Sequence, residues 1–201
     1  MQQKKFVLWL HRALKSFLYI FVSLLVVCYP LLSSPDYERI QAYRKEKDAL
    51  YYSVVQPHFT LVFPMSIDSE EAFINEVKKR AAGIKAFKFN LRCATVNKDS
   101  FNNYYHTFLV PDEGYSNFVK LHDALYEQNF RPHLRLDIDF VPHIGIGNST
   151  DAMQCKAMAD EWNLSNFCIS GSAQSLQVLR YENSRVETLY SFDLLSDPHG
   201  H

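Results

Sequence analysis

Two histidines in this chain of 201 residues share the same local context. Residues 58–61 read His-Phe-Thr-Leu and residues 143–146 read His-Ile-Gly-Ile, and each histidine follows a proline in an apolar, strand-like run. An imidazole titrates near neutral pH, so one neutral and one protonated histidine can serve together as a general base and a general acid. The pair therefore predicts proton-transfer chemistry at one site that is built from two copies of a unit.

Alternation of side chains separates a polar face from an apolar face in each copy. On an extended strand, successive side chains point to opposite faces. His58 then shares a face with Thr60, and His143 shares the corresponding face with Gly145, where the hydroxyl is missing. The opposite face of each strand carries apolar residues, which we expect to lie in the core.

The segments that follow the two histidine motifs also repeat. Residues 69–82 and 150–162 both place apolar residues at helical spacing, and a strand candidate follows each of them, at 86–91 and 167–170. The order of strand, helix and strand thus occurs twice. This internal duplication predicts an α+β protein with two similar lobes, in which antiparallel-rich sheets line a central cleft and the helices lie outside.

The paired motifs resemble the two-histidine (2H) phosphoesterase superfamily, the group with 2′,5′ RNA ligases and RNA 2′,3′-cyclic phosphodiesterases. The signature of that family is two copies of His-x-Thr/Ser-x; the first copy here matches it fully, and the second departs from it at Gly145. The resemblance implies a phosphodiesterase that needs neither metal nor cofactor, with His58 and His143 as general acid and base. The sequence does not say which histidine is the base.

Three further residues are candidates for holding the phosphate. Thr60 can donate a hydrogen bond to the charge that develops on the phosphate oxygens. Arg135 lies just upstream of the second motif and could pair with phosphate, although a solvated arginine fits its position equally well. Gly145 has two interpretations: the missing Cβ lets a backbone N–H approach the phosphate, which is the favoured one, or this copy has lost a phosphate ligand.

These residues predict a phosphodiesterase that acts on 2′,3′-cyclic phosphate or 2′,5′-linked RNA or nucleotide ends, with RNA ligation as its reverse reaction. The alternative is a nucleotide or RNA-end binding protein whose catalysis is weakened or lost because of Gly145. The formal net charge is −1, so we expect no extended nucleic-acid surface. The expected partner is a small nucleotide or an RNA end, bound by a monomer.

The amino terminus leaves two cellular locations open. Basic residues precede an apolar run that ends at Tyr29, which is typical of a signal sequence or a short membrane anchor. The duplicated unit, however, requires a strand before its first helix, and residues 24–29 supply one. We therefore expect a cytoplasmic protein. The alternative is a form anchored to the membrane through residues 6–29.

One domain without an internal linker is expected. Residues 22–195 form the two-lobed phosphoesterase unit, residues 1–21 an extension and residues 196–201 a tail. The four cysteines show no paired spacing typical of a metal site. Three of them lie in apolar strand candidates, where we expect buried free thiols: Cys28, Cys93 and Cys168.

The remaining elements are predicted from periodicity and turn residues. Residues 36–47 form a helix with Ile40 and Tyr43 inward and with a solvated charged face that includes Arg44. The other expected elements are a strand at 104–110, a helix at 115–128, and a hairpin of 174–181 with 186–194.

Overall fold

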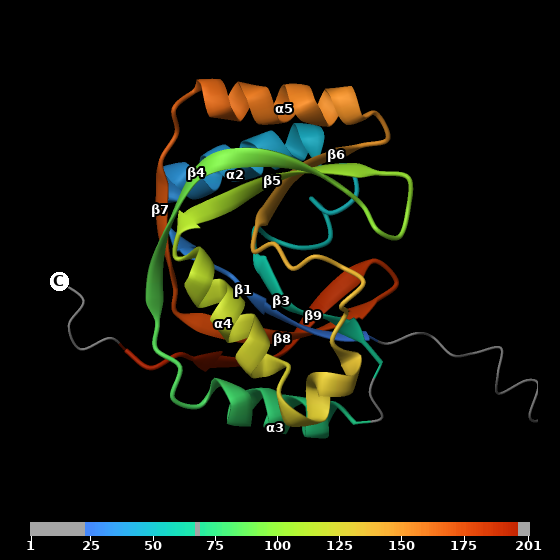
Figure 1. Ribbon diagram of the computed structural model, residues 1–201, viewed down its shortest axis with the longest axis vertical. Coiled ribbons are helices and arrows are strands. Elements are labelled where there is room, and N and C mark those ends of the chain that lie inside the picture. Colours follow the sequence, from blue (N-terminus) through green and yellow to red (C-terminus); the bar gives the residue numbers. More distant parts are fainter. Residues whose placement is uncertain (1–22, 67–68, 197–201) are drawn as a thin grey trace, which may run out of the picture.

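Two antiparallel sheets form the framework of the computed structural model, which describes residues 23–66 and 69–196 (Figure 1). The first sheet has the strand order β3-β1-β8-β9, and the second has the order β2-β7-β4-β5-β6. The expected α+β class with antiparallel-rich sheets is confirmed. The extension expected at residues 1–21 lies outside the described residues, as does the tail beyond residue 196.

The strands and helices have the following bounds. The first sheet contains β1 (Ser23–Cys28), β3 (Phe59–Met65), β8 (Ser175–Glu182) and β9 (Arg185–Asp193). The second contains β2 (Leu31–Leu32), β4 (Phe87–Lys98), β5 (Tyr105–Glu113), β6 (Ile144–Ser149) and β7 (Ile169–Ala173). The helices are α2 (Ser34–Lys47), α3 (Glu70–Ala81), α4 (Tyr115–Leu125), α5 (Ala152–Leu164) and the short 3-10 helix η1 (Gln128–His133).

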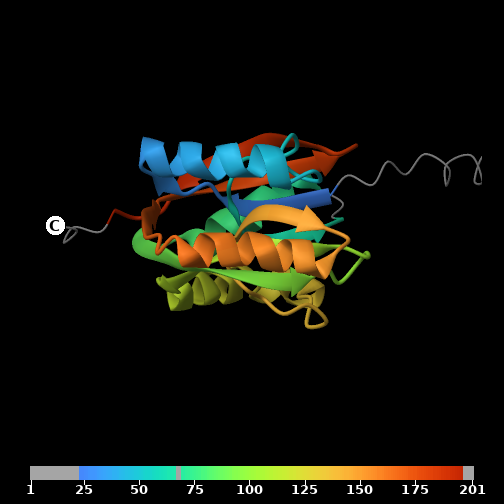
Figure 2. The same ribbon diagram turned by 90° about the horizontal axis from the view of Figure 1, so that it is seen from above.

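The duplicated unit is present as β3-α3-β4 and β6-α5-β7. Helix α4 packs against β3 and against α3, whereas α5 packs against β4, β5 and β6, and α2 packs against β6. Helices α5 and α3 therefore lie at opposite ends of the molecule, with the sheets between them (Figure 1). Figure 2 shows the same arrangement from above, with α2 and α5 running side by side.

Local sequence signals set the ends of several elements. Ser33, Ser69 and Asp151 each accept a hydrogen bond from a backbone N–H in the first turn of the helix that follows. The hairpin between β8 and β9 turns at Asn183 and Ser184, whose φ angles are 51° and 57°. Positive φ at both central residues is the geometry of the tight turn that joins two antiparallel strands. The expected hairpin is thus confirmed.

Strand β1 lies between β3 and β8, and five of its six residues are buried. The strand expected at residues 24–29 is therefore confirmed, and this part of the apolar run belongs to the sheet rather than to an anchor. In the part of the chain that the structure describes, no helix is long and apolar enough to cross a membrane. The rest of the alternative anchor lies outside the described residues.

Two predicted element boundaries are wrong. The helix expected at 115–128 ends at Leu125, and Gln128, which has a φ of 51°, begins the separate 3-10 helix η1. The strand expected at 86–91 continues to Lys98, because β4 pairs with β5 far beyond the segment that pairs with β7. Pairing with a distant strand, rather than local composition, sets this length.

The expectation of buried thiols holds for Cys28 but not for the other two cysteines named with it. Cys93 is half-buried, and Cys168 is exposed just before β7 begins. Cys168 follows an apolar residue, but it lies in the connection between α5 and β7, where its side chain is exposed. The prediction of a buried Cys168, which was based on a short apolar run, is therefore wrong.

Side chains of α4 and of the residue that caps its end cover the free edge of β3, the strand that follows His58. The Nδ1 of His122 lies 2.8 Å from the carbonyl oxygen of Leu61, and the backbone N–H of Phe63 donates to the hydroxyl of Tyr126 at 2.9 Å. An edge strand presents unpaired backbone groups that must find other partners when they are buried. These side chains thus bind the edge of β3, where a neighbouring strand would otherwise pair with it.

Candidate active site

The two histidine motifs meet between the sheets. His58 directly precedes β3, and His143 directly precedes β6. In Figure 1 the start of β3 and the chain that enters β6 lie side by side at the centre of the molecule. The two imidazoles are close enough that the charge of His58 lowers the pKa of His143. The structure therefore brings the two predicted site histidines together.

Both imidazoles are held by the backbone in the same way. The Nδ1 of His58 lies 2.7 Å from the carbonyl oxygen of Gln56, and the Nδ1 of His143 lies 2.6 Å from that of Val141. Because a carbonyl oxygen only accepts, each Nδ1 carries the proton, and Nε2 is the basic atom of the neutral ring. In both copies the carbonyl belongs to the residue before a proline, which favours an extended backbone.

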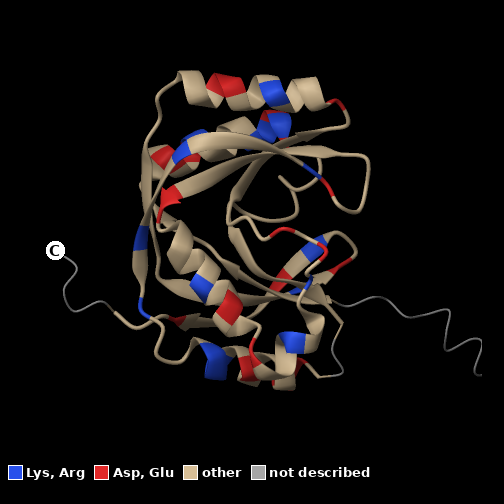
Figure 3. Cartoon of the chain, viewed as in Figure 1, with Lys and Arg blue, Asp and Glu red and all other residues tan. Residues whose placement is uncertain are grey.

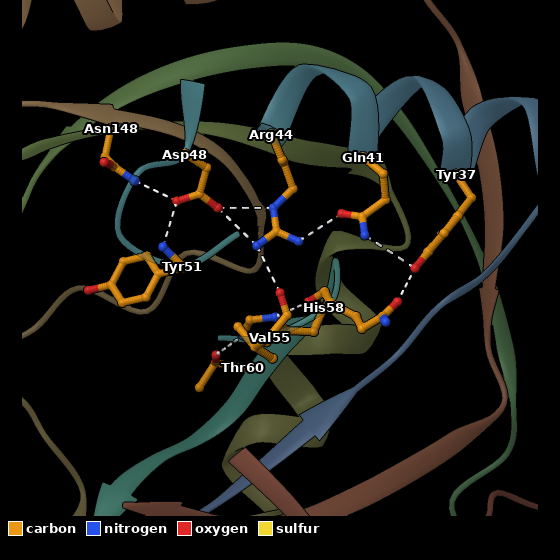
Figure 4. Close-up of polar contacts among 10 residues, drawn as sticks. Tyr37, Gln41, Arg44, Asp48, Tyr51, Val55, His58, Thr60 and Asn148 are labelled. Carbon is orange, nitrogen blue, oxygen red and sulfur yellow. Dashed lines mark hydrogen bonds and ion pairs between the residues drawn. The ribbon is translucent and has the colours of Figure 1, made fainter. Parts of the chain in front are cut away.

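The hydroxyl of Thr60 lies beside the first histidine. Its Oγ1 is 3.1 Å from the Nε2 of His58, as Figure 4 shows. Thr60 and His58 thus share a strand face, as their spacing predicts. With His58 neutral, the hydroxyl donates its one proton to Nε2; once Nε2 is protonated, the same hydroxyl is free to donate to a phosphate oxygen.

The sequence matches the model of the 2′-5′ RNA ligase superfamily over residues 32–185. The chain belongs to this superfamily. The resemblance to the 2H phosphoesterases is thereby confirmed, and membership supports an activity of the phosphoesterase type. No curated protein sequence matches the chain.

Solved structures of the same fold cover most of this chain. Escherichia coli LigT complexed with 3′-AMP has 15% identity and a TM-score of 0.52, with 87% of this chain and 98% of LigT covered. The protein TT0787 of Thermus thermophilus has 13% identity and a TM-score of 0.56, with 87% of this chain and 99% of that chain covered. At these identities the likeness shows a shared fold.

Substitution of Thr60 by alanine is expected to lower kcat by about 10²-fold, because it removes one hydrogen-bond donor from the charge that develops on the phosphate. The measurement is the initial rate on a 2′,3′-cyclic nucleotide. Thr95→Ala is the matched control, since Thr95 lies on β4 and contacts Asn97 instead of a histidine. An unchanged rate in Thr60→Ala would remove Thr60 from the site.

Gly145 leaves open space where the second hydroxyl of the superfamily signature would lie. The glycine is in β6 opposite Phe108, and a Cβ added to it would meet no heavy atom within 4 Å. The sequence favoured a close backbone approach to the phosphate. The same open space would admit a hydroxyl side chain or a phosphate oxygen close to the backbone, so it is compatible with both interpretations.

Gly145→Thr separates the two interpretations: if a hydroxyl donor has been lost, the substitution should raise kcat/KM on a cyclic nucleotide by about tenfold, a part of the 10²–10³-fold that one donor contributes in a well-formed site. A β-branched residue suits a strand, and its Cβ would meet no heavy atom within 4 Å. A fall in kcat/KM with an unchanged melting temperature would instead support the backbone approach, because the new side chain would then crowd the ligand.

Aromatic rings support the second histidine. Phe108 stacks on His143 with 3.4 Å between ring centroids, and His106 stacks on Phe108 at 5.9 Å. His106 and Phe108 alternate along β5 and so share one face of the sheet. The Nε2 of His106 lies 2.8 Å from a carboxylate oxygen of Asp99. Across the described residues, no group of three or more His, Cys, Asp or Glu could hold a metal ion.

Burial lowers the pKa of both site histidines. The pKa of His58 falls from 6.5 to about 4, chiefly by desolvation; its hydrogen bond to Gln56 opposes the shift, and the charge of Arg44 adds to it. The pKa of His143 also falls to about 4 by desolvation, aided by His58 and His106. Both rings are therefore neutral at pH 7 in the free protein. A bound phosphate anion would raise these pKa values again.

Arg135, the third predicted phosphate ligand, is paired elsewhere. Its Nε and Nη2 bind both carboxylate oxygens of Asp137, at 2.7 and 2.6 Å, and its guanidinium lies 5.1 Å from the ring centroid of Phe101. Within residues 23–66 and 69–196, no hydrogen bond or ion pair joins Arg135 to either histidine. Its contacts give no support to a role in phosphate binding.

Sequence reasoning missed the buried ion pair beside His58. Arg44 was expected on a solvated face, but its side chain is only 2% exposed and lies 2.9 Å from Asp48, which is 3% exposed (Figure 4). An arginine and an aspartate four residues apart at the end of α2 are the only local signal of this pair. The burial follows from the loop after α2, which folds back over the helix end.

Proposed function

We propose that the protein is a metal-independent phosphodiesterase that acts on 2′,3′-cyclic phosphates or 2′,5′-linked RNA or nucleotide ends. The observation that carries this proposal is the matched pair of histidines, each fixed through Nδ1 with Nε2 as its basic atom. Membership of the 2′-5′ RNA ligase superfamily supports it. Structures of the same fold include LigT complexed with 3′-AMP and with phosphate, ligands of the expected chemical class.

The proposed reaction uses the two imidazoles in different protonation states. One neutral Nε2 takes a proton from water as the water oxygen forms a bond to phosphorus. The protonated Nε2 of the other ring gives its proton to the ribose oxygen as the bond from that oxygen to phosphorus breaks. The Thr60 hydroxyl donates to a non-bridging phosphate oxygen, where negative charge accumulates. One phosphomonoester with a free ribose hydroxyl results.

The charge distribution supports a small substrate. Lysine and arginine alternate with aspartate and glutamate over the helices and strands of both lobes (Figure 3). This interspersed pattern and the formal net charge of −1 do not favour binding along a long phosphate backbone. A nucleotide or an RNA end held at its phosphate fits this distribution. The expected cytoplasmic location and monomeric state stay predictions.

A second function is favoured by one observation, the missing hydroxyl at Gly145. A site with one of its two phosphate donors absent would bind a nucleotide or RNA end and turn it over slowly or not at all. The protein would then be a binding module that kept the superfamily fold.

Hydrolysis of 2′,3′-cyclic nucleotides by the full chain in the presence of a chelator separates the two functions. We expect turnover to a nucleoside monophosphate that the chelator does not reduce. Binding of the same nucleotide without turnover, measured by calorimetry, would overturn the phosphodiesterase and support the binding module. Loss of turnover in chelator that returns with a divalent ion would overturn the metal-independent mechanism.

A further inference from the structure

The Arg44 side chain at the end of α2 uses its donors to hold the loop that leads to His58. Its Nε donates to Oδ2 of Asp48 at 3.0 Å, and its Nη1 donates to the side chain of Gln41 at 3.1 Å. Its Nη2 donates to the carbonyl oxygen of Val55 at 2.9 Å. With only 2% of the side chain exposed, none of these donors is available to a substrate.

Asp48 connects the same loop to the strand that follows His143. Its Oδ1 accepts from the backbone N–H of Tyr51 at 3.0 Å and from the side-chain amide of Asn148 at 2.5 Å. Asn148 belongs to β6, which begins directly after His143. One buried carboxylate therefore binds the segment before the first histidine and the strand after the second (Figure 4).

A third contact from α2 reaches the residue that orients His58. The hydroxyl of Tyr37 donates to the side chain of Gln56, and the carbonyl oxygen of Gln56 accepts from the Nδ1 of His58 at 2.7 Å. The loop from residue 51 to residue 57 is thus held by α2 near its start and at two points near its end. Its conformation decides where the Nε2 of His58 lies.

We propose that Arg44 and Asp48 are positioning residues for the paired-histidine site, which hold the loop of His58 against the strand of His143. This inference rests on the proposed function, since it concerns the alignment of the acid and the base. Stability alone is a poor account of the pair. A buried ion pair gains little over apolar residues of similar volume, because desolvation of both charges offsets their attraction.

The pair also sets the charge around His58. The groups that face this imidazole are Arg44 and Asp48 from α2, the ring of Tyr29 after β1 at 6.2 Å, and His143 before β6. Arg44 lowers the pKa of His58, and Asp48 raises it. Removal of one charge should therefore shift this pKa in the direction opposite to removal of the other. Opposite shifts would show that both charges act on this imidazole, whereas the positioning role itself is tested by kcat.

The first test is the double substitution Arg44→Met/Asp48→Leu, which fills the space and leaves no buried charge unpaired. We expect a folded protein with a lower melting temperature, since the polar groups that Arg44 and Asp48 bind lose their partners. At an assay temperature below the transition, KM should be unchanged and kcat about 10²-fold lower, the effect of a misplacement near 1 Å. The matched control is Glu76→Leu/Arg80→Met, a second pair four residues apart, on α3, whose other partners are Glu127 and Asn129. Its kcat should equal that of the unsubstituted chain.

The second test needs no substrate. NMR titration of the His58 ring in the ligand-free protein should give a higher pKa in Arg44→Met and a lower pKa in Asp48→Asn. No shift, or shifts of the same sign, would overturn the electrostatic part of the proposal. If a single variant does not fold, kcat of the double variant decides alone.

Failure of this inference can be told from failure of the proposed function. If Arg44→Met/Asp48→Leu has a normal kcat while His58→Ala is inactive, the positioning role is overturned and the proposed function is not. An active His58→Ala would overturn the proposed function, whereas the NMR shifts would still test the charge effect of Arg44 and Asp48.

Discussion

His58→Ala and His143→Ala are each expected to abolish measurable turnover, a loss of up to about 10⁴-fold for a general acid or base. Each ring is half-buried at the start of a strand and is held by one backbone hydrogen bond, so its removal should leave the fold intact. The measurement is kcat on a 2′,3′-cyclic nucleotide, with the melting temperature as a check on folding.

The double variant His58→Ala/His143→Ala should lose about as much as either single variant, because an acid and a base that act in one step are not additive. His133→Ala serves as the matched control, since this histidine is exposed on η1. Near wild-type hydrolysis in either single site variant would exclude the paired-histidine mechanism.

Local patterns predicted the parts of the site that depend on strand periodicity. Alternation placed Thr60 on the face of His58, and the contact between Oγ1 and Nε2 agrees with that placement. The repeated order of elements predicted two lobes, and the sheets that contain β3 and β6 show them. These features follow from residues that are close in sequence, where side-chain direction is set by the backbone alone.

Parts of the site that depend on distant pairing could not be predicted. Phe108 reaches His143 only because β5 pairs with β6, and Asp48 reaches Asn148 only because the end of α2 packs on the same strand. Arg44 has the composition of a solvated helix face, and the loop that buries it is recognisable only when folded. Single-sequence periodicity has no information on which segment covers which face.

A fall of kcat/KM with rising pH is the second large effect that we expect. The proposed hydrolysis requires one neutral and one protonated imidazole, and the pKa of both His58 and His143 is about 4 in the free protein. At pH values above 4, the fraction of protein that carries a single proton on this pair decreases tenfold per pH unit. Since kcat/KM reports the free enzyme, it should fall about 100-fold between pH 5 and pH 7. Because the two rings interact, the measured pKa values describe the pair and not either histidine alone.

The pH profile of kcat should differ from that of kcat/KM, because the phosphate anion stabilises the protonated imidazole in the complex and moves the decline to higher pH.

Histidines with a depressed pKa also destabilise the fold in acid: the unfolded chain takes up protons near pH 6.5 and the folded chain near pH 4. Stability is therefore complete above pH 6.5 and decreases below it. Circular dichroism at each pH must accompany the rates, and a flat kcat/KM between pH 5 and pH 7 in folded protein would contradict two neutral histidines.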